Sequence, residues 1–145
     1  MSGASAARPV VAEAPGAFDD DELHALADLG YALLAEGRLD DARVLWEGVA
    51  SAAPQGEAAW RALAVIAARE RRWADVEPFA TAALGRRPGA AAFLLRAEAR
   101  WRSGRYSEAA MDLEAIARVT PRSEDERAIQ RRAAALHARL RRPGA

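Results

Sequence analysis

Few residues in this sequence of 145 amino acids have the types and spacing that catalysis or metal binding requires. The acidic run Asp19 to Glu22 precedes the first segment with helical apolar spacing. Carboxylates are favoured at a helix N-terminus, so a structural role explains this run. Histidine occurs only at His24 and His137, and cysteine is absent. The chain contains no Ser-His-Asp order and no HExxH, GxGxxG or GxxxxGK pattern. We therefore predict no catalytic residue, no metal site and no cofactor, and we expect that the protein is not an enzyme.

All 21 basic residues are arginine, so the chain lacks the lysine that Schiff-base chemistry and a phosphate-binding loop need. Four arginine pairs stand mostly where helices are expected to end, which is where cations are favoured. These pairs are Arg71-Arg72, Arg86-Arg87, Arg131-Arg132 and Arg141-Arg142. Nucleic-acid contact by the arginine-rich C-terminal third is the alternative interpretation. The net charge of zero argues against it, because nucleic-acid-binding domains are usually basic.

The charges are distributed unevenly along the chain. Residues 1–57 contain 3 arginines and 11 acids, a balance of −8. Residues 58–89 have 6 arginines and 3 acids (+3), and residues 90–145 have 12 and 7 (+5). This polarity favours a partner that is steered by charge, or head-to-tail self-association, and it is compatible with a homodimer.

The composition predicts an all-α chain, because alanine makes up about a quarter of it and is a strong helix former but a poor strand former. No apolar run approaches the roughly 20 residues of a membrane span, and the N-terminus does not read as a secretory signal. We therefore expect a soluble, cytoplasmic protein that does not engage a membrane. Residues 1–18 are rich in Ala, Ser, Pro and Gly and are predicted to be a disordered tail.

Three prolines, Pro54, Pro88 and Pro121, are separated by 34 and 33 residues and indicate an internal repeat. A block with two helical runs precedes each proline. In the first block, one apolar stripe consists of Leu26, Leu29, Leu33 and Leu34, and a second of Leu39, Ala42, Leu45, Trp46 and Val49. A glycine, Gly37 or Gly104, separates the two runs in the first and third blocks. The repeats cover residues 23–56, 57–89 and 90–122.

This pattern resembles the tetratricopeptide repeat (TPR) family. Small residues stand at repeat position 8 (Gly30, Ala64 and Ala97) and at position 20 (Ala42 and Ala109), where paired helices approach closely. Large residues (Trp46, Trp60 and Trp73) are expected to fill the space between hairpins. The sequence departs from the family pattern at Arg71 in place of glycine, at Val76 and at Arg96. The resemblance implies a right-handed superhelix of three helix-turn-helix repeats within residues 19–122.

The segment after the third repeat is predicted to form a C-terminal capping helix within residues 123–141. Ser123 to Glu126 has the form of a capping box, and apolar residues with helical spacing follow within a helix expected over residues 124–140. Such a helix would cover the last repeat. Within the second repeat, a helix that starts near Ala74 would have Pro78 just past its first turn, where the proline removes one hydrogen bond. Pro78 therefore predicts a late start of this helix or a kink.

In the TPR family, the first helix of each repeat lines a concave groove that holds an extended peptide or a helix of a partner. The resemblance therefore implies a partner-binding site of ten residues: Asp28, Tyr31, Arg61, Val65, Arg69, Leu94, Leu95, Glu98, Trp101 and Arg102. Trp101 faces the groove in the register counted from Ala90, but it becomes a core residue if the register shifts by one, and we favour the core.

The predicted function is that of a small TPR adaptor or chaperone with a protein partner. The subclass that grips heat-shock proteins needs lysine and asparagine, which this chain lacks. The corresponding positions hold Ala27, Tyr31 and Ala62. We therefore exclude that clamp. A narrower alternative is a translocator chaperone of bacterial type III secretion, to which the chain is similar in size, repeat number, N-terminal extension and C-terminal helix.

Overall fold

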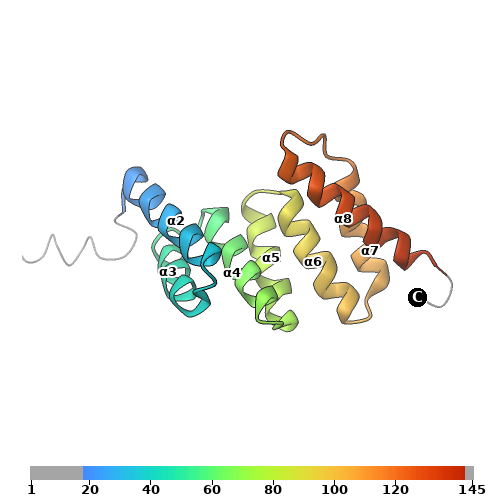
Figure 1. Cartoon of the computed structure of the whole chain (residues 1–145), viewed down its shortest axis with the longest axis horizontal. Helices are drawn as coiled ribbons and strands as arrows, with labels where there is room; N and C mark the ends of the chain where they lie inside the picture. Colours follow the sequence, from blue (N-terminus) through green and yellow to red (C-terminus); the bar gives the residue numbers. More distant parts are fainter. Residues whose placement is uncertain (1–17, 143–145) are drawn as a thin grey trace, which may run out of the picture.

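The computed structural model describes residues 18–142 and is all-α (Figure 1). The described residues form seven helices: α2 (Asp20–Ala35), α3 (Leu39–Ala52), α4 (Glu57–Arg69), α5 (Trp73–Arg86), α6 (Ala90–Arg102), α7 (Tyr106–Ala117) and α8 (Glu124–Leu140). The predicted disordered tail, residues 1–18, lies outside the described range except for Phe18, which is exposed and precedes α2. The all-α prediction is thus confirmed for the described part of the chain.

The helices pack as three consecutive hairpins followed by a single helix. α2 pairs with α3, α4 with α5 and α6 with α7, and each hairpin contacts the next. The first helices also touch one another in sequence, α2 with α4, α4 with α6 and α6 with α8. Figure 1 shows the resulting stack, with α2 at one end of the long axis and α8 at the other. Because α8 contacts both α6 and α7, it takes the place that the first helix of a fourth hairpin would have.

The turn inside each hairpin has the same backbone geometry. Gly37 and Gly104 have positive φ angles of 75° and 78°, and the equivalent residue of the second hairpin is Arg71, with φ of 60°. In all three turns the next backbone N–H donates to a carbonyl oxygen five residues earlier, from Arg38 to Leu33, Arg72 to Ala67 and Arg105 to Arg100. This is the hydrogen bond of a Schellman motif, which usually uses glycine because a Cβ disfavours the left-handed conformation.

The small residues lie where the two helices of a hairpin approach closely, as the sequence pattern predicts. Gly30 faces the indole of Trp46, and both Trp46 and Ala42 are completely buried. The equivalent pairs, Ala64 with Val76 and Ala97 with Ala109, are also completely buried. Burial of these residues agrees with the repeat registers counted from the sequence, including the second, where valine replaces the small residue of position 20.

Leu29 departs from the predicted apolar stripe of α2. Its side chain is 52% exposed, whereas Leu33 and Leu34 are buried. Among the described helices, α2 contacts only α3 and α4. The side of α2 that carries Leu29 therefore has no helix to pack against, since this is the first hairpin of the described stack.

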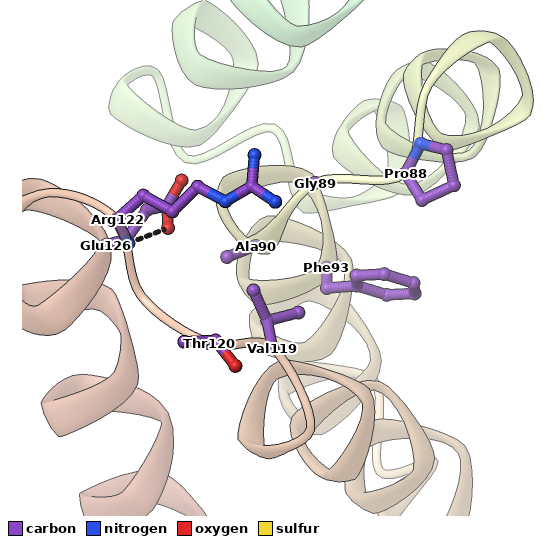
Figure 2. Close-up of a pocket in the computed structure, with 8 residues that line it drawn as sticks. All are labelled: Pro88, Gly89, Ala90, Phe93, Val119, Thr120, Arg122 and Glu126. Atoms are coloured by element: carbon purple, nitrogen blue, oxygen red, sulfur yellow. Dashed lines mark hydrogen bonds between the residues drawn. The ribbon is translucent and has the colours of Figure 1, made fainter.

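Helix α8 begins at the predicted capping sequence. The Ser123 side-chain oxygen accepts from the Glu126 N–H at 3.1 Å. The Glu126 carboxylate accepts from the Arg122 N–H at 2.8 Å, one residue earlier than in an ideal capping box. Figure 2 shows this hydrogen bond beside a shallow cavity that Phe93 and Val119 also line. The N–H group of Glu126 in the first turn of α8 and that of Arg122 before the helix are thereby satisfied.

Helix α5 begins at Trp73 and runs through Pro78 to Arg86. The predicted late start is therefore wrong, while the kink stays a prediction. Pro78 lies past the first turn, where it cannot donate to the carbonyl of Ala74. Its ring is on the exposed side of the helix.

Candidate functional site

The candidate site lies on the surface formed by α2, α4, α6 and α8, which we call the first-helix face. All ten predicted partner-binding residues belong to the first three of these helices. Asp28, Tyr31, Arg69 and Arg102 are exposed, and Arg61, Val65, Leu95, Glu98 and Trp101 are half-buried. Most of the predicted residues are thus accessible. Many of the other residues of α4 are alanines, which have little side chain to contact a partner.

Leu94 is the exception among the predicted residues. It is 7% exposed and packs in the core cluster of Leu113, Ile116 and Ala133. Ile129 and Leu136 of α8 pack against the same cluster. Because α8 covers this part of α6, Leu94 has almost no surface to offer a partner, and its placement among the contact residues needs correction.

An apolar pocket of about 340 Å³ opens at the α2 end of the first-helix face. It lies between α2, α3 and the start of α4, and Leu23, Ala27, Tyr31, Trp46, Val49 and Ala58 supply its apolar lining. The rings of Tyr31 and Trp46 lie 5.1 Å apart between centroids, at a tilt of 56°. His24 and Asp28 also line the pocket. The charged group that lines the pocket is thus the carboxylate of Asp28. We call this cavity the Tyr31 pocket.

Two predicted contact arginines of α4 connect that helix to α2. Arg61 donates to the hydroxyl oxygen of Tyr31 at 3.3 Å and pairs with Glu57 at 3.1 Å. Arg69 donates to the backbone carbonyl of Leu34 at 2.6 Å, near the C-terminus of α2, where helix carbonyls lack partners within the helix. Arg61 therefore orients the side chain beside the Tyr31 pocket, while Arg69 fixes the spacing of α2 and α4.

The opposite end of the first-helix face is rich in arginine and tryptophan. Glu98, Trp101 and Arg102 of α6 line a cavity of about 270 Å³ together with Arg132, Leu136 and Arg139 of α8. Trp101 is half-buried and lies outside the core clusters. The preference for a core position was therefore wrong. The register counted from Ala90 holds, and it directs Trp101 to the surface.

The arginines of α8 were not identified from the sequence as site residues. Arg132 pairs with Glu98 at 2.8 Å, and the Arg139 guanidinium lies 5.1 Å from the centre of the Trp101 ring. Their spacing of seven residues places both on one side of α8. That spacing could have identified Arg132 and Arg139 as site residues. It was not used because α8 was predicted only to cap the last repeat.

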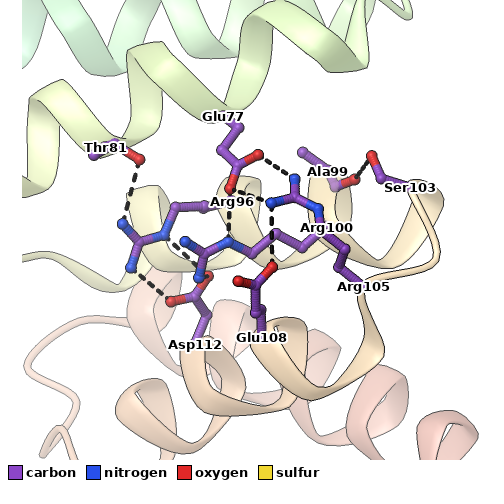
Figure 3. A network of polar contacts seen from close by, with 9 residues as sticks. All are labelled: Glu77, Thr81, Arg96, Ala99, Arg100, Ser103, Arg105, Glu108 and Asp112. Carbon is purple, nitrogen blue, oxygen red and sulfur yellow. Dashed lines mark hydrogen bonds and ion pairs between the residues drawn. The ribbon is translucent and has the colours of Figure 1, made fainter.

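The departure at Arg96 is explained by a polar network that connects α5, α6 and α7 (Figure 3). Asp112 is 3% exposed and accepts from Arg96 at 2.8 and 3.0 Å and from Arg100 at 3.0 Å. Arg100 also pairs with Glu77 at 2.8 Å. Hydrogen bonding from Arg105, and then from Arg100, lowers the pKa of Glu77 below its ordinary value of 4.5. The network replaces an apolar contact with paired charges and has a structural role.

The described residues hold neither a metal-ligand cluster nor a membrane-spanning helix. Within residues 18–142, no three His, Asp or Glu side chains converge as a metal site would require. None of the helices in this range has the length and hydropathy needed to cross a bilayer. The first-helix face carries an apolar pocket at one end and arginines beside tryptophan rings at the other.

No protein-family model matches the chain, and no curated protein matches it. A solved structure does match: the first TPR of Spaghetti (RPAP3) bound to the HSP90 peptide SRMEEVD. The TM-score is 0.68 at 20% sequence identity, and the match covers 83% of this chain and 96% of that one. Three hairpins with small residues at the predicted positions, followed by one further helix, are arranged as in that domain. The chain therefore has the tetratricopeptide-repeat fold.

Proposed function

We propose that this chain is a protein-interaction module that binds an extended or helical segment of a partner protein along the first-helix face. The observation that carries the proposal is the Tyr31 pocket. It is an apolar cavity of about 340 Å³ on a surface made of ordered helices. Apolar pockets with few polar groups at their rim are typical of ligand sites, and a side chain of a bound segment would release water from this one.

The charges around the Tyr31 pocket favour a particular kind of anchor. Asp28 lines the pocket and is exposed, and the first turn of α2 adds Asp20, Asp21 and Glu22. A positive residue next to an apolar one in the partner segment would therefore find a complementary surface. We expect an apolar side chain in the cavity and a Lys or Arg beside it.

The peptide of the matched structure fits this surface poorly. That TPR binds an HSP90 peptide ending in acidic residues, SRMEEVD. In this chain, the positions where the heat-shock clamp needs lysine or asparagine include Tyr31 and the buried Ala62, and the neighbouring charge is the carboxylate of Asp28. Repulsion between carboxylates would oppose an acidic peptide at this pocket. The narrower assignment to type III secretion translocator chaperones stays a prediction.

Selection of peptides from a random display library on the immobilised protein tests the proposal. We expect the selected sequences to share an apolar residue adjacent to Lys or Arg. Tyr31→Ala, which removes one wall of the pocket, and Asp28→Arg, which reverses the rim charge, should each weaken the selected peptides about tenfold or more. The matched controls are Met111→Ala and Glu47→Arg, exposed positions on α7 and α3.

Circular dichroism establishes that each variant keeps its helices, so that loss of binding is distinguished from loss of fold. Unchanged affinity in both Tyr31→Ala and Asp28→Arg would refute the assignment of the pocket. Equal weakening by Glu47→Arg would mean that net charge, rather than the pocket, determines the affinity.

A further inference from the structure

We infer that a second contact site, which binds an acidic peptide segment, lies at the other end of the first-helix face and extends to the turn between α4 and α5. The site, which we call the arginine–tryptophan cluster, consists of Arg71, Trp73, Trp101, Arg102 and Arg139. The inference rests on the proposed function in one respect, that the ligand is a segment of a protein. It assigns the chemistry of that segment at a place distinct from the Tyr31 pocket.

The cluster is built from arginine side chains that lie over tryptophan rings. The Arg102 guanidinium carbon lies 4.4 Å from the centre of the Trp73 ring and 5.7 Å from that of Trp101. Arg139 approaches Trp101 at 5.1 Å. Two adjoining cavities share Trp101 and Arg102. One lies between α6 and α8, and the other, of about 560 Å³, extends to Arg71, Trp73 and Tyr106 at the hairpin turns.

The arginines of the cluster differ from most others in the structure because acids do not neutralise them. Within residues 18–142, Arg71, Arg102 and Arg139 have no carboxylate within 4.0 Å. Glu98 is the acid among the residues lining the two cavities, and Arg132 pairs with it. Four arginines and one glutamate leave the lining a balance of +3.

Contact with the rings prepares these guanidinium groups for carboxylates. A guanidinium group that lies over a ring is held there by the negative ring face, while its N–H groups stay able to donate. The paired N–H groups of a guanidinium form a fork that matches the two oxygens of a carboxylate. Binding the carboxylate then costs less side-chain entropy, because the arginine is already held in place. Tyr106 is exposed and lines the same cavity, and its hydroxyl group is a further donor.

Single-stranded nucleic acid is the competing ligand for a surface of arginine and aromatic residues. Its bases bind by stacking on open ring faces. Here arginine side chains already lie over the Trp73 and Trp101 rings. The net charge of zero also gives the chain as a whole no attraction for a phosphate backbone, although residues 90–145 have a balance of +5. The observations therefore favour an acidic peptide.

The two ends of the first-helix face then select opposite charges. The Tyr31 pocket, with Asp28, favours a basic residue beside an apolar anchor, and the arginine–tryptophan cluster favours acids. A partner segment that reaches both ends would be bipolar, and the direction in which it lies would be fixed by charge.

Fluorescence anisotropy with a fluorescein-labelled hexaglutamate peptide tests the inference, at low ionic strength so that screening is weak. Hexaglutamate should bind the wild-type protein more tightly than either hexalysine or a twelve-residue oligothymidylate. Arg102→Glu and Arg139→Glu should each weaken it about tenfold or more, the loss expected for one charge-assisted pair. Arg102→Lys, which keeps the charge but not the fork, should give a smaller loss.

The matched control is Arg87→Glu, which changes the net charge equally at an exposed site outside the cluster and should have less than about a twofold effect. Tyr31→Ala should leave hexaglutamate binding unchanged, so that failure of the proposed function and failure of this inference are distinguishable. Should Arg102→Glu unfold, the NMR indole N–H signals of wild-type Trp73 and Trp101 provide the readout, since hexaglutamate should shift both.

Three results would overturn the inference. The first is no binding of hexaglutamate, or no shift of the two indole signals. The second is a loss caused by Arg87→Glu as large as that caused by Arg102→Glu, which would mean that net charge acts without a site. The third is tighter binding of the oligothymidylate, which would make the cluster a nucleic-acid surface.

Discussion

Adding a single methyl group to Gly30 should destabilise the first hairpin, because the group would overlap the indole of Trp46. A Cβ at Gly30 would lie 2.5 Å from the Cε2 atom of Trp46 and 2.6 Å from both Cζ2 and Nε1. Trp46 is completely buried in a core cluster with Leu33 and Leu34, so the ring can shift only by disturbing that packing. Forcing extra volume into a packed core costs about 1–3 kcal/mol. The helix propensity of alanine offsets about 1 kcal/mol of that cost.

Gly48 provides the matched comparison, because a Cβ there would meet nothing within 4 Å. It lies in α3, the partner helix of α2, so Gly48→Ala should stabilise the protein by about 1 kcal/mol through propensity alone. The propensity term is common to both variants. The difference between their unfolding free energies therefore isolates the steric cost, about 1–3 kcal/mol in favour of Gly48→Ala.

Urea denaturation followed by far-ultraviolet circular dichroism measures this difference. In thermal melts, the two variants should differ by roughly 4–12 °C, taking roughly 4 °C per kcal/mol for a domain of this size. Gly85→Ala, which has equally open surroundings in α5, should behave like Gly48→Ala. If Gly30→Ala is as stable as Gly48→Ala, Trp46 does not pack tightly against α2, and the argument from close helix approach is refuted.

Three further predictions concern the turns and the polar network. Arg71→Gly should stabilise the protein by up to about 1 kcal/mol in urea denaturation, because it relieves a left-handed residue that glycine tolerates; a loss of stability would mean that the side chain matters more than the backbone. Asp112→Ala should cost about 3–5 kcal/mol in the same assay, since it leaves Arg96 and Arg100 without their buried carboxylate; a cost below about 1 kcal/mol would contradict the structural role of the network. The pKa of Glu77 is lower in the folded than in the unfolded chain, so its stabilising effect is present above about pH 4.5 and is lost as the pH falls through the folded value. Glu77→Gln should therefore reduce the slope of stability against pH on the acidic side, and an unchanged slope would exclude this contribution.

The fold could be predicted from the sequence because its determinants are local and repeated. The spacing of the prolines and the small residues at Gly30, Ala64 and Ala97 define the same hairpin three times, and the structure keeps each register. The capping sequence at Ser123 likewise acts on the next few residues alone. Periodicity identifies such elements because each depends on neighbours within one turn of helix.

The site was less predictable because it depends on contacts between distant residues. Leu94 and Trp101 occupy groove positions of the same helix, but α8 buries the first and leaves the second accessible. The pairing of Arg96 with Asp112 joins residues 16 positions apart on different helices, which no spacing rule indicates. At Arg71 the sequence departs from the glycine of the pattern, yet the backbone keeps the same left-handed turn, since the fold imposes it on a residue that does not favour it.

Helix α8 both closes the stack and supplies Arg132 and Arg139 to the first-helix face. Among the described helices it contacts only α6 and α7, and Ala133 is its one buried residue. A helix held on one side in this way is among the segments expected to open first in local unfolding. A ligand that contacts both α6 and α8 would bind only while α8 is packed against α6. A bound ligand would therefore slow amide hydrogen exchange along α8. Ligand binding and the local unfolding of α8 are in that way governed by one equilibrium.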